Sequence, residues 1–181
     1  MQLLNIDKTL AEINATYEAA VLKHIAETDA DTAYQIDLSE PFFGIEWGVV
    51  EGNVQRQKWR WLGPRGQSHL FLKLSTATDH LIRVYIHTAT SGQVLQALTA
   101  LVNGTRCAQQ GQDWGADGVA SHWCLVNREL LAKHQGVAKI TWSLLRTEET
   151  PRATLNSVPG QPTHARSIAF SRIKCEPYPV S

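Results

Sequence analysis

Long hydrophobic runs and an excess of charge of either sign are missing from this sequence of 181 residues. No stretch of about eighteen consecutive apolar residues occurs, so we expect no transmembrane helix and no membrane insertion. The 17 basic residues balance the 17 acidic residues, and a chain without net charge has no general attraction for nucleic acid or anionic lipid. We therefore expect no nucleic-acid partner.

Cysteine is sparse, with 3 residues at positions 107, 124 and 175. An odd number at wide spacing is typical of reduced thiols in a cytosolic protein rather than of a disulfide framework. The N-terminal segment from Met1 to Leu4 is followed by charged residues and develops no secretory hydrophobic region. These features predict a cytoplasmic protein.

Recognisable catalytic motifs are also missing. The sequence has no Gly-rich phosphate loop, no Gly-x-Ser-x-Gly, no Cys-x-x-Cys and no His-Glu-x-x-His. Its 7 histidines are scattered, although His69 and His87 fall on polar faces of predicted strands, where folding could assemble a metal cluster. We expect no catalytic residues, no cofactor and no metal, and hence no enzyme. An enzyme that uses loop carboxylates or histidines on a β scaffold is the open alternative.

The first 30 residues contain the stripe of an amphipathic helix. Apolar residues recur at alternate spacings of three and four, at Leu3, Ile6, Leu10, Ile13, Tyr17 and Ala20. Such a stripe must be covered. It can pack on its own domain, or residues 3–25 can pair with the same helix of a second copy, because the spacing also fits a short coiled coil.

From residue 31 to residue 181 the period changes to two, which predicts half-buried strands. Alternating apolar residues occur in the segments 34–38, 70–74, 82–86 and 138–144, and a final strand is predicted over 168–175. Turn-rich stretches such as Gly63–Gly66 separate them. This spacing is typical of an antiparallel β-sandwich, so we expect an N-terminal helix (1–30) followed by one β-sandwich domain (31–181).

Three segments interrupt this pattern. Residues 94–102 fit helical as well as strand spacing, and the Asn103-Gly104 hairpin signal that follows favours a strand. Good helix formers from Asn127 to His134, with Gly136 as a stop signal, predict a short helix. The polar segment 148–164, which contains three prolines, is predicted to be a long loop.

Tryptophan is the most informative residue type, with 6 in the chain. Three of them, Trp47, Trp59 and Trp61, lie close together, and alternation places Trp59 and Trp61 on one strand face with Arg60 on the other. Indole rings stack on the C–H faces of sugars, while nearby Glu and Arg side chains hydrogen-bond to hydroxyl groups. These tryptophans can equally fill the core, as we expect of Trp142.

A further tryptophan, Trp114, lies in the polar segment Asp113–Gly118. An exposed loop tryptophan beside carboxylates is a candidate ligand contact, although it can also fold back over the core. Asp113 and Asp117 could alternatively hold a structural calcium ion, but two carboxylates are fewer than calcium usually collects.

Four short motifs occur in a recognisable order: Gly44-x-x-Trp47-x-x-x-Glu51, Trp59-Arg60-Trp61-x-Gly63, Asn103-Gly104, and Arg166-x-Ile168-Ala169-Phe170-Ser171-Arg172-Ile173. Over about residues 40–177 the sequence resembles the β-sandwich modules found beside bacterial glycosyltransferases. It departs from their pattern in lacking an attached transferase, in its N-terminal helix, and in Ala169 where those modules often have glycine.

The resemblance implies a jelly-roll-like fold similar to carbohydrate-binding modules, a link to bacterial surface-polysaccharide synthesis, and no catalysis. We expect a glycan or a glycosyltransferase as partner, with ligand contacts from Trp47, Glu51, Arg60, Asp113 and Trp114. Glu51 and Arg60 could instead form an internal ion pair. The alternative function is a protein–protein interaction module that oligomerises through its helix.

Overall fold

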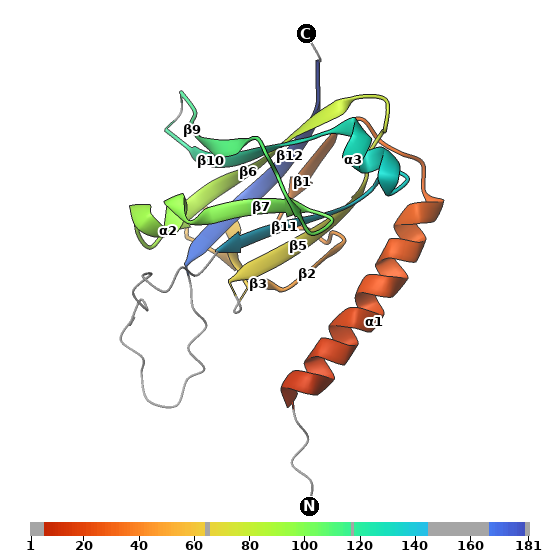
Figure 1. Cartoon of the computed structure of the whole chain (residues 1–181). Coiled ribbons are helices and arrows are strands. Elements are labelled where there is room, and N and C mark those ends of the chain that lie inside the picture. Colours follow the sequence, from red (N-terminus) through yellow and green to blue (C-terminus); the bar gives the residue numbers. More distant parts are fainter. Residues whose placement is uncertain (1–5, 64–65, 117, 145–166, 180–181) are drawn as a thin grey trace, which may run out of the picture.

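The computed structural model of the chain describes residues 6–63, 66–116, 118–144 and 167–179. A long N-terminal helix, α1 (Ile6–Glu27), is followed by short helices and by strands that pair antiparallel. Figure 1 shows the strands gathered in one body with α1 at its side. The prediction of a mainly β, antiparallel fold with an N-terminal helix is confirmed. None of the described helices is long and apolar enough to cross a membrane.

Within the described residues, the larger sheet has seven strands in the order β3-β4-β12-β6-β10-β9, with β1 also paired to β12. Its strands are β1 (Tyr34–Asp37), β3 (Trp47–Gly52), β4 (Lys58–Leu62), β6 (Asp79–Ala89), β9 (Gln110–Trp114), β10 (Ala120–Val126) and β12 (Ile168–Tyr178). The long strands β6 and β12 form its centre.

The smaller sheet, again among the described residues, has five strands in the order β2-β5-β11-β7-β8. They are β2 (Gly44–Ile45), β5 (Gln67–Lys73), β7 (Leu98–Val102), β8 (Thr105–Arg106) and β11 (Val137–Leu144). Two short helices, α2 (Gly92–Gln96) and α3 (Arg128–Lys133), connect strands of the two sheets.

Inward-facing residues of both sheets form one buried cluster. Trp142 on β11 is 1% exposed and Phe170 on β12 is fully buried, and their ring centroids lie 6.5 Å apart. This cluster is the physical cause of the alternation that predicted the strands. Every second side chain of a strand leaves water and enters the cluster, and each large apolar one contributes about 1.5–3 kcal/mol to the free energy of folding. The prediction that Trp142 belongs to the core is confirmed.

Helix α1 contacts the smaller sheet through residues of its C-terminal half. Val21 and Ile25 are 5% and 3% exposed and pack with Phe71 of β5. The Lys139 Nζ of β11 lies 2.6 Å from Glu18 Oε1. Ala20, the last residue of the predicted stripe, is exposed, and the buried apolar contacts come instead from Val21 and Ile25.

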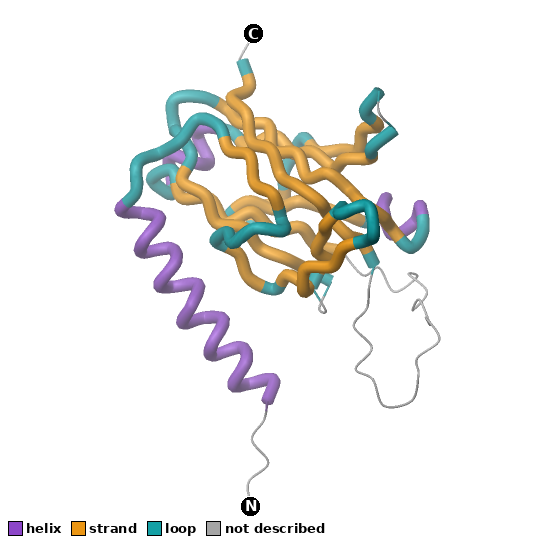
Figure 2. The backbone as a smooth tube through the Cα atoms, turned by 180° about the vertical axis from the view of Figure 1, so that it is seen from behind, coloured by secondary structure: helices purple, strands orange, loops and turns teal. Residues whose placement is uncertain are grey.

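The N-terminal half of α1 extends away from the strands, as both views of the backbone show (Figures 1 and 2). Leu10, Ile13 and Tyr17 on this half are 46%, 58% and 40% exposed. They lie on the same side of the helix as Val21 and Ile25, because their spacings add up to nearly whole turns. The apolar stripe is therefore covered at one end and open at the other.

The prediction of a strand over residues 94–102 is wrong in its first half. Val94 and Leu95 lie in α2, and the strand β7 begins at Leu98. The reason is local, since Ser91 caps the helix and its side chain accepts a hydrogen bond from the Val94 backbone N–H at 3.2 Å.

The predicted hairpin and the predicted short helix are confirmed. Asn103 and Gly104 both have positive φ, 50° and 79°, as a two-residue hairpin turn between β7 and β8 requires. Helix α3 forms as expected, and Gly136 follows it with φ of 80°. The cysteines are free and buried. The segment 148–164 lies outside the described residues.

Candidate functional site

Trp47 opens β3 and belongs to the core. Its ring lies 6.0 Å from Trp142 and 6.0 Å from Phe170, between centroids, and 5.5 Å from Phe42. Its indole N–H donates to the His69 carbonyl at 2.8 Å. The ring is half-buried, packs against core residues and has its polar atom satisfied, which supports a structural role for Trp47.

Arg60 also makes its contacts within the protein. Its Nε donates to the Leu38 carbonyl at 2.5 Å and its Nη1 to the Gly48 carbonyl at 3.2 Å, with the guanidinium 5.5 Å from the centre of the Phe42 ring. Burial lowers the pKa of this guanidinium. The side chain joins β4 to two neighbouring segments and is not directed at a ligand.

Glu51 lies on the opposite face of the same hairpin. The β3–β4 register pairs Glu51 with Trp59 and Val50 with Arg60, and successive positions on a strand point to opposite faces. The carboxylate accepts a hydrogen bond from the Trp61 indole N–H at 3.0 Å. This geometry separates Glu51 from Arg60, so it does not favour the ion pair between them.

The prediction of a loop at Asp113 and Trp114 is wrong, because both residues end strand β9, where Trp114 pairs with Ala120, and successive side chains on a strand point in different directions. Asp113 Oδ2 lies 2.8 Å from Arg83 Nη1, and the hydrogen bond from Arg83 holds the pKa of Asp113 below its usual range. Trp114 is 66% exposed, so its indole is open to solvent. A large trough lies on the larger sheet, and of the predicted ligand residues Trp114 alone lines it.

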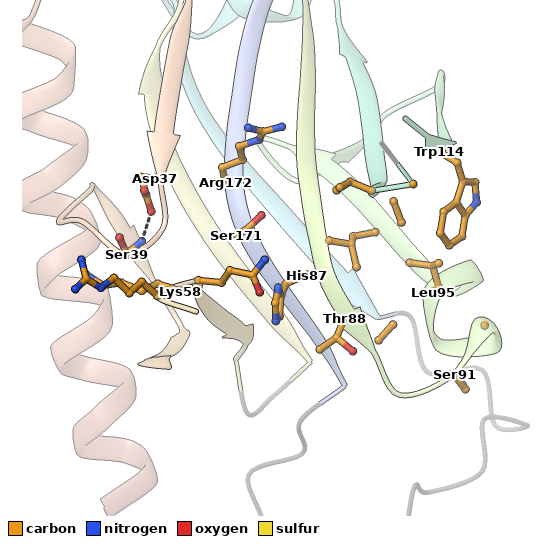
Figure 3. A pocket seen from close by; sticks show the side chains of 18 of the residues that line it. Asp37, Ser39, Lys58, His87, Thr88, Ser91, Leu95, Trp114, Ser171 and Arg172 are labelled. Atoms are coloured by element: carbon orange, nitrogen blue, oxygen red, sulfur yellow. Dashed lines mark hydrogen bonds between the residues drawn. The ribbon is translucent and has the colours of Figure 1, made fainter. Parts of the chain in front are cut away.

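A trough of about 1100 Å³ runs across the larger sheet. Asp37, Ser39 and Lys58 lie at one end, and Leu95 and Trp114 lie at the other (Figure 3). His87, Thr88, Ser171 and Arg172 lie between the two ends. Residues of the neighbouring strands β4, β12, β6, β10 and β9 line it. Four strand spacings correspond to a length of about 19 Å, which suits an extended ligand.

The trough follows the end of β6 that extends past its neighbour. The last pair between β10 and β6 is Ser121 with Tyr85, yet β6 continues to Ala89. Along residues 86–89 one edge of β6 pairs with β12, and the other is paired with no described strand. An open edge offers backbone N–H and C=O groups to a ligand.

Irregular pairing shapes the middle of the trough. The β12–β6 register shifts between Ala169 and Phe170 and again between Phe170 and Arg172, and such bulges redirect side chains. Next to these shifts the His87 imidazole stacks on Trp59, with ring centroids 4.1 Å apart and planes inclined by 11°. The Arg172 guanidinium lies 4.0 Å from the centre of the Tyr85 ring.

Sequence reasoning assigned no ligand contact to Arg56, Lys58, His87 or Arg172, which all line the trough. The alternation in β6 already placed His87 on a polar face, which was the available signal. The others come from separate strands, and only the sheet order brings them to one trough.

A second polar cluster lies on the smaller sheet beside α1. His69 Nδ1 lies 2.8 Å from Thr141 Oγ1, and His69 Nε2 lies 3.2 Å from Glu46 Oε2. Burial and then the Lys139 ammonium lower the pKa of His69, against the opposing effect of Glu46. His69 and Thr141 are each 8% exposed, so a chain of hydroxyl, imidazole and carboxylate is present but covered.

Across the described ranges, no group of three or more His, Cys, Asp or Glu side chains is arranged to hold a metal ion. Asp117, one of the two carboxylates considered for calcium, lies outside these ranges. Neither a scan against protein-family models nor a search of curated proteins gives a match for this chain.

Proposed function

We propose that the chain is a non-catalytic carbohydrate-binding or scaffolding module linked to bacterial surface-polysaccharide synthesis, and that the trough is its glycan site. The fold in this proposal is a jelly-roll-like β-sandwich in the cytoplasm. The core cluster shared by the two sheets supports the sandwich. The motif order around Trp47, Trp59 and Asn103 supports the link to glycosyltransferases.

The exposed indole of Trp114 in a polar trough carries the proposal. A tryptophan that is 66% exposed gains nothing from burial in its own fold, and its ring offers an apolar face at a trough otherwise rich in hydroxyl, carboxylate and cationic groups. Glycan sites combine one or more aromatic faces with directional polar groups. The open edge of β6 adds backbone donors and acceptors for sugar hydroxyls.

Replacing Trp114 with alanine is expected to weaken glycan binding about tenfold or more, which corresponds to about 1.4 kcal/mol, and to leave the melting temperature almost unchanged because the ring is exposed. An array of bacterial polysaccharide fragments identifies a ligand, and titration calorimetry measures the affinity. Tyr178→Ala is the matched control, because Tyr178 is an exposed aromatic residue outside the trough. Unchanged affinity in Trp114→Ala would remove the trough from the proposal.

Self-association through α1 is a second candidate function, favoured by the open end of the helix stripe. Leu10, Ile13 and Tyr17 continue the line of the docked residues Val21 and Ile25. Three large apolar side chains at helical spacing form the seam that a second copy of the same helix can cover. A partner helix would extend a contact that the smaller sheet already makes.

Sedimentation equilibrium is expected to give about twice the monomer mass of 20.1 kDa for the native chain. Ile13→Lys places a charge in the seam and should yield monomers. Ala15→Lys adds the same charge on the opposite side of the helix, where Ala15 is exposed, and should remain dimeric. A native chain that sediments as a monomer at high concentration would rule out this candidate.

A further inference from the structure

Cations outnumber carboxylates along the trough. Arg56, Lys58 and Arg172 line it together with Asp37 and Glu40. The three cations are exposed, and among the described residues none of them forms a salt bridge. The chain as a whole has no net charge, so this local excess is a property of the site and not of the protein surface in general.

Arg56 occupies a backbone conformation that favours glycine. Its φ is 63°, and a non-glycine residue in this region costs of order 1 kcal/mol or more. The hairpin around it is held by Asn53, whose Oδ1 accepts hydrogen bonds from the Gln55 and Gln57 backbone N–H groups at 3.0 and 3.1 Å. The turn therefore presents the guanidinium at the trough from a constrained position.

Arg172 is oriented in a different way, by stacking on an aromatic ring. It follows the register shift in β12, and its guanidinium lies over the Tyr85 ring. A stacked guanidinium keeps its N–H groups free in the plane, where they can pair with the two oxygens of a carboxylate or phosphate. The stacking also reduces the entropy lost when a ligand binds.

Two carboxylates line the trough beside the cations. Asp37 Oδ1 already accepts a hydrogen bond from the Ser39 backbone N–H at 2.8 Å (Figure 3). Glu40 is exposed next to it. Asp37 keeps its negative charge and lies opposite Arg172 in the β1–β12 register, so a ligand meets three cations against two carboxylates, which favours an anionic group.

We infer that the trough takes an acidic glycan, with a sugar ring on Trp114 and a carboxylate or phosphate group held by Arg56, Lys58 and Arg172. This inference rests on the proposed glycan-binding function. Lys58 lies at one end of the trough, Arg172 between the ends and the Trp114 indole at the other end, so a ligand that contacts all three is an extended chain of several sugar rings. The ligand is a glycan rather than a nucleic acid, because three cations against two carboxylates in one trough are only a small local excess in an uncharged chain.

The test uses four probes on the full chain: an oligogalacturonate, the same oligomer with its carboxyl groups reduced, a polyglycerol phosphate, and an oligothymidylate. The native protein should bind the oligogalacturonate or the polyglycerol phosphate at least tenfold more tightly than the neutral oligomer, and the tighter of the two identifies the acidic group. Raising the salt concentration should reduce this preference, because exposed charges are screened within about 8 Å at physiological ionic strength.

The variant Lys58→Gln/Arg172→Gln should lose the preference for the acidic probe and keep its affinity for the neutral one. Lys174→Gln is the matched control, because Lys174 lies on the same strand as Arg172 and pairs with Glu176 at 2.7 Å outside the trough. Thermal melts of both variants verify folding, and Arg56→Gly provides a third loss of charge at a position where glycine is unstrained.

The outcomes separate this inference from the proposed function. Equal binding of acidic and neutral oligomers, or an unchanged preference in the double variant, overturns the acidic-glycan inference and leaves the glycan site standing. Tightest binding of the oligothymidylate overturns it in favour of a nucleic acid. Binding of none of the probes at millimolar concentration overturns the proposed function, and this inference with it.

Discussion

Replacing Trp47 with alanine is expected to lower the free energy of unfolding by about 2–3 kcal/mol, somewhat below the range for a fully buried aromatic side chain because the ring is half-buried. The ring contacts Phe42, Trp142 and Phe170. Its loss would leave a cavity between the two sheets and would also leave the His69 carbonyl without its indole donor. Urea unfolding followed by far-UV circular dichroism measures the change.

Trp47→Phe is the graded control. A phenyl ring keeps much of the aromatic packing and removes the N–H donor, so its cost should be clearly smaller than that of alanine. Glycan affinity should survive in both variants at temperatures where they are folded, because Trp47 does not line the trough. A loss of binding without a loss of stability would return Trp47 to the list of ligand residues.

Acidification is expected to destabilise the protein through His122. This residue of β10 is 2% exposed, and its Nδ1 has no hydrogen-bond partner among the described residues. Burial lowers the pKa of His122 from 6.5 to about 4. The unfolded chain therefore binds a proton below pH 6.5 that the folded chain takes up only near pH 4.

The direction in which stability changes with pH follows from this difference in proton uptake. The contribution of neutral His122 to stability is complete above pH 6.5 and is lost as the pH falls toward 4, with a total change of about 3 kcal/mol. Unfolding measured at pH 7 and pH 4.5 in the native chain and in His122→Leu isolates the effect. The variant should show a flatter pH dependence, and two parallel profiles would contradict the assignment.

Several parts of the fold followed from short-range chemistry. The alternation over 82–86 and 138–144 identified strands that form the centre of each sheet, because the pleat itself has a period of two. Asn103-Gly104 specified its hairpin, and Gly136 followed the predicted helix α3. The local error at Val94 and Leu95 came from overlooking Ser91 as a helix cap.

The candidate site was predicted much less well. Trp47 and Trp114 were both candidate ligand residues in the sequence, with Trp114 the better one, and the structure packs Trp47 half-buried against the core and exposes Trp114 at the trough. Trp47 is the first residue after Glu46, whose φ of 60° marks the point where the chain passes from the smaller sheet to the larger one. That crossover decides which way the indole points, and the spacing of residues in the sequence does not predict it.

The sequence alone determined which side chains share a face. Alternation put Trp59 and Trp61 on one face of a strand and Arg60 on the other. Helical spacing put Leu10, Ile13 and Tyr17 on one stripe. Only the tertiary structure decided which face is inward and which end of the stripe is covered. The physical reason is that periodicity is a property of one segment, whereas burial depends on the neighbours that the sheet order brings alongside it. The trough shows the same limit, because Lys58, His87 and Arg172 meet only through the pairing of β4 and β6 with β12.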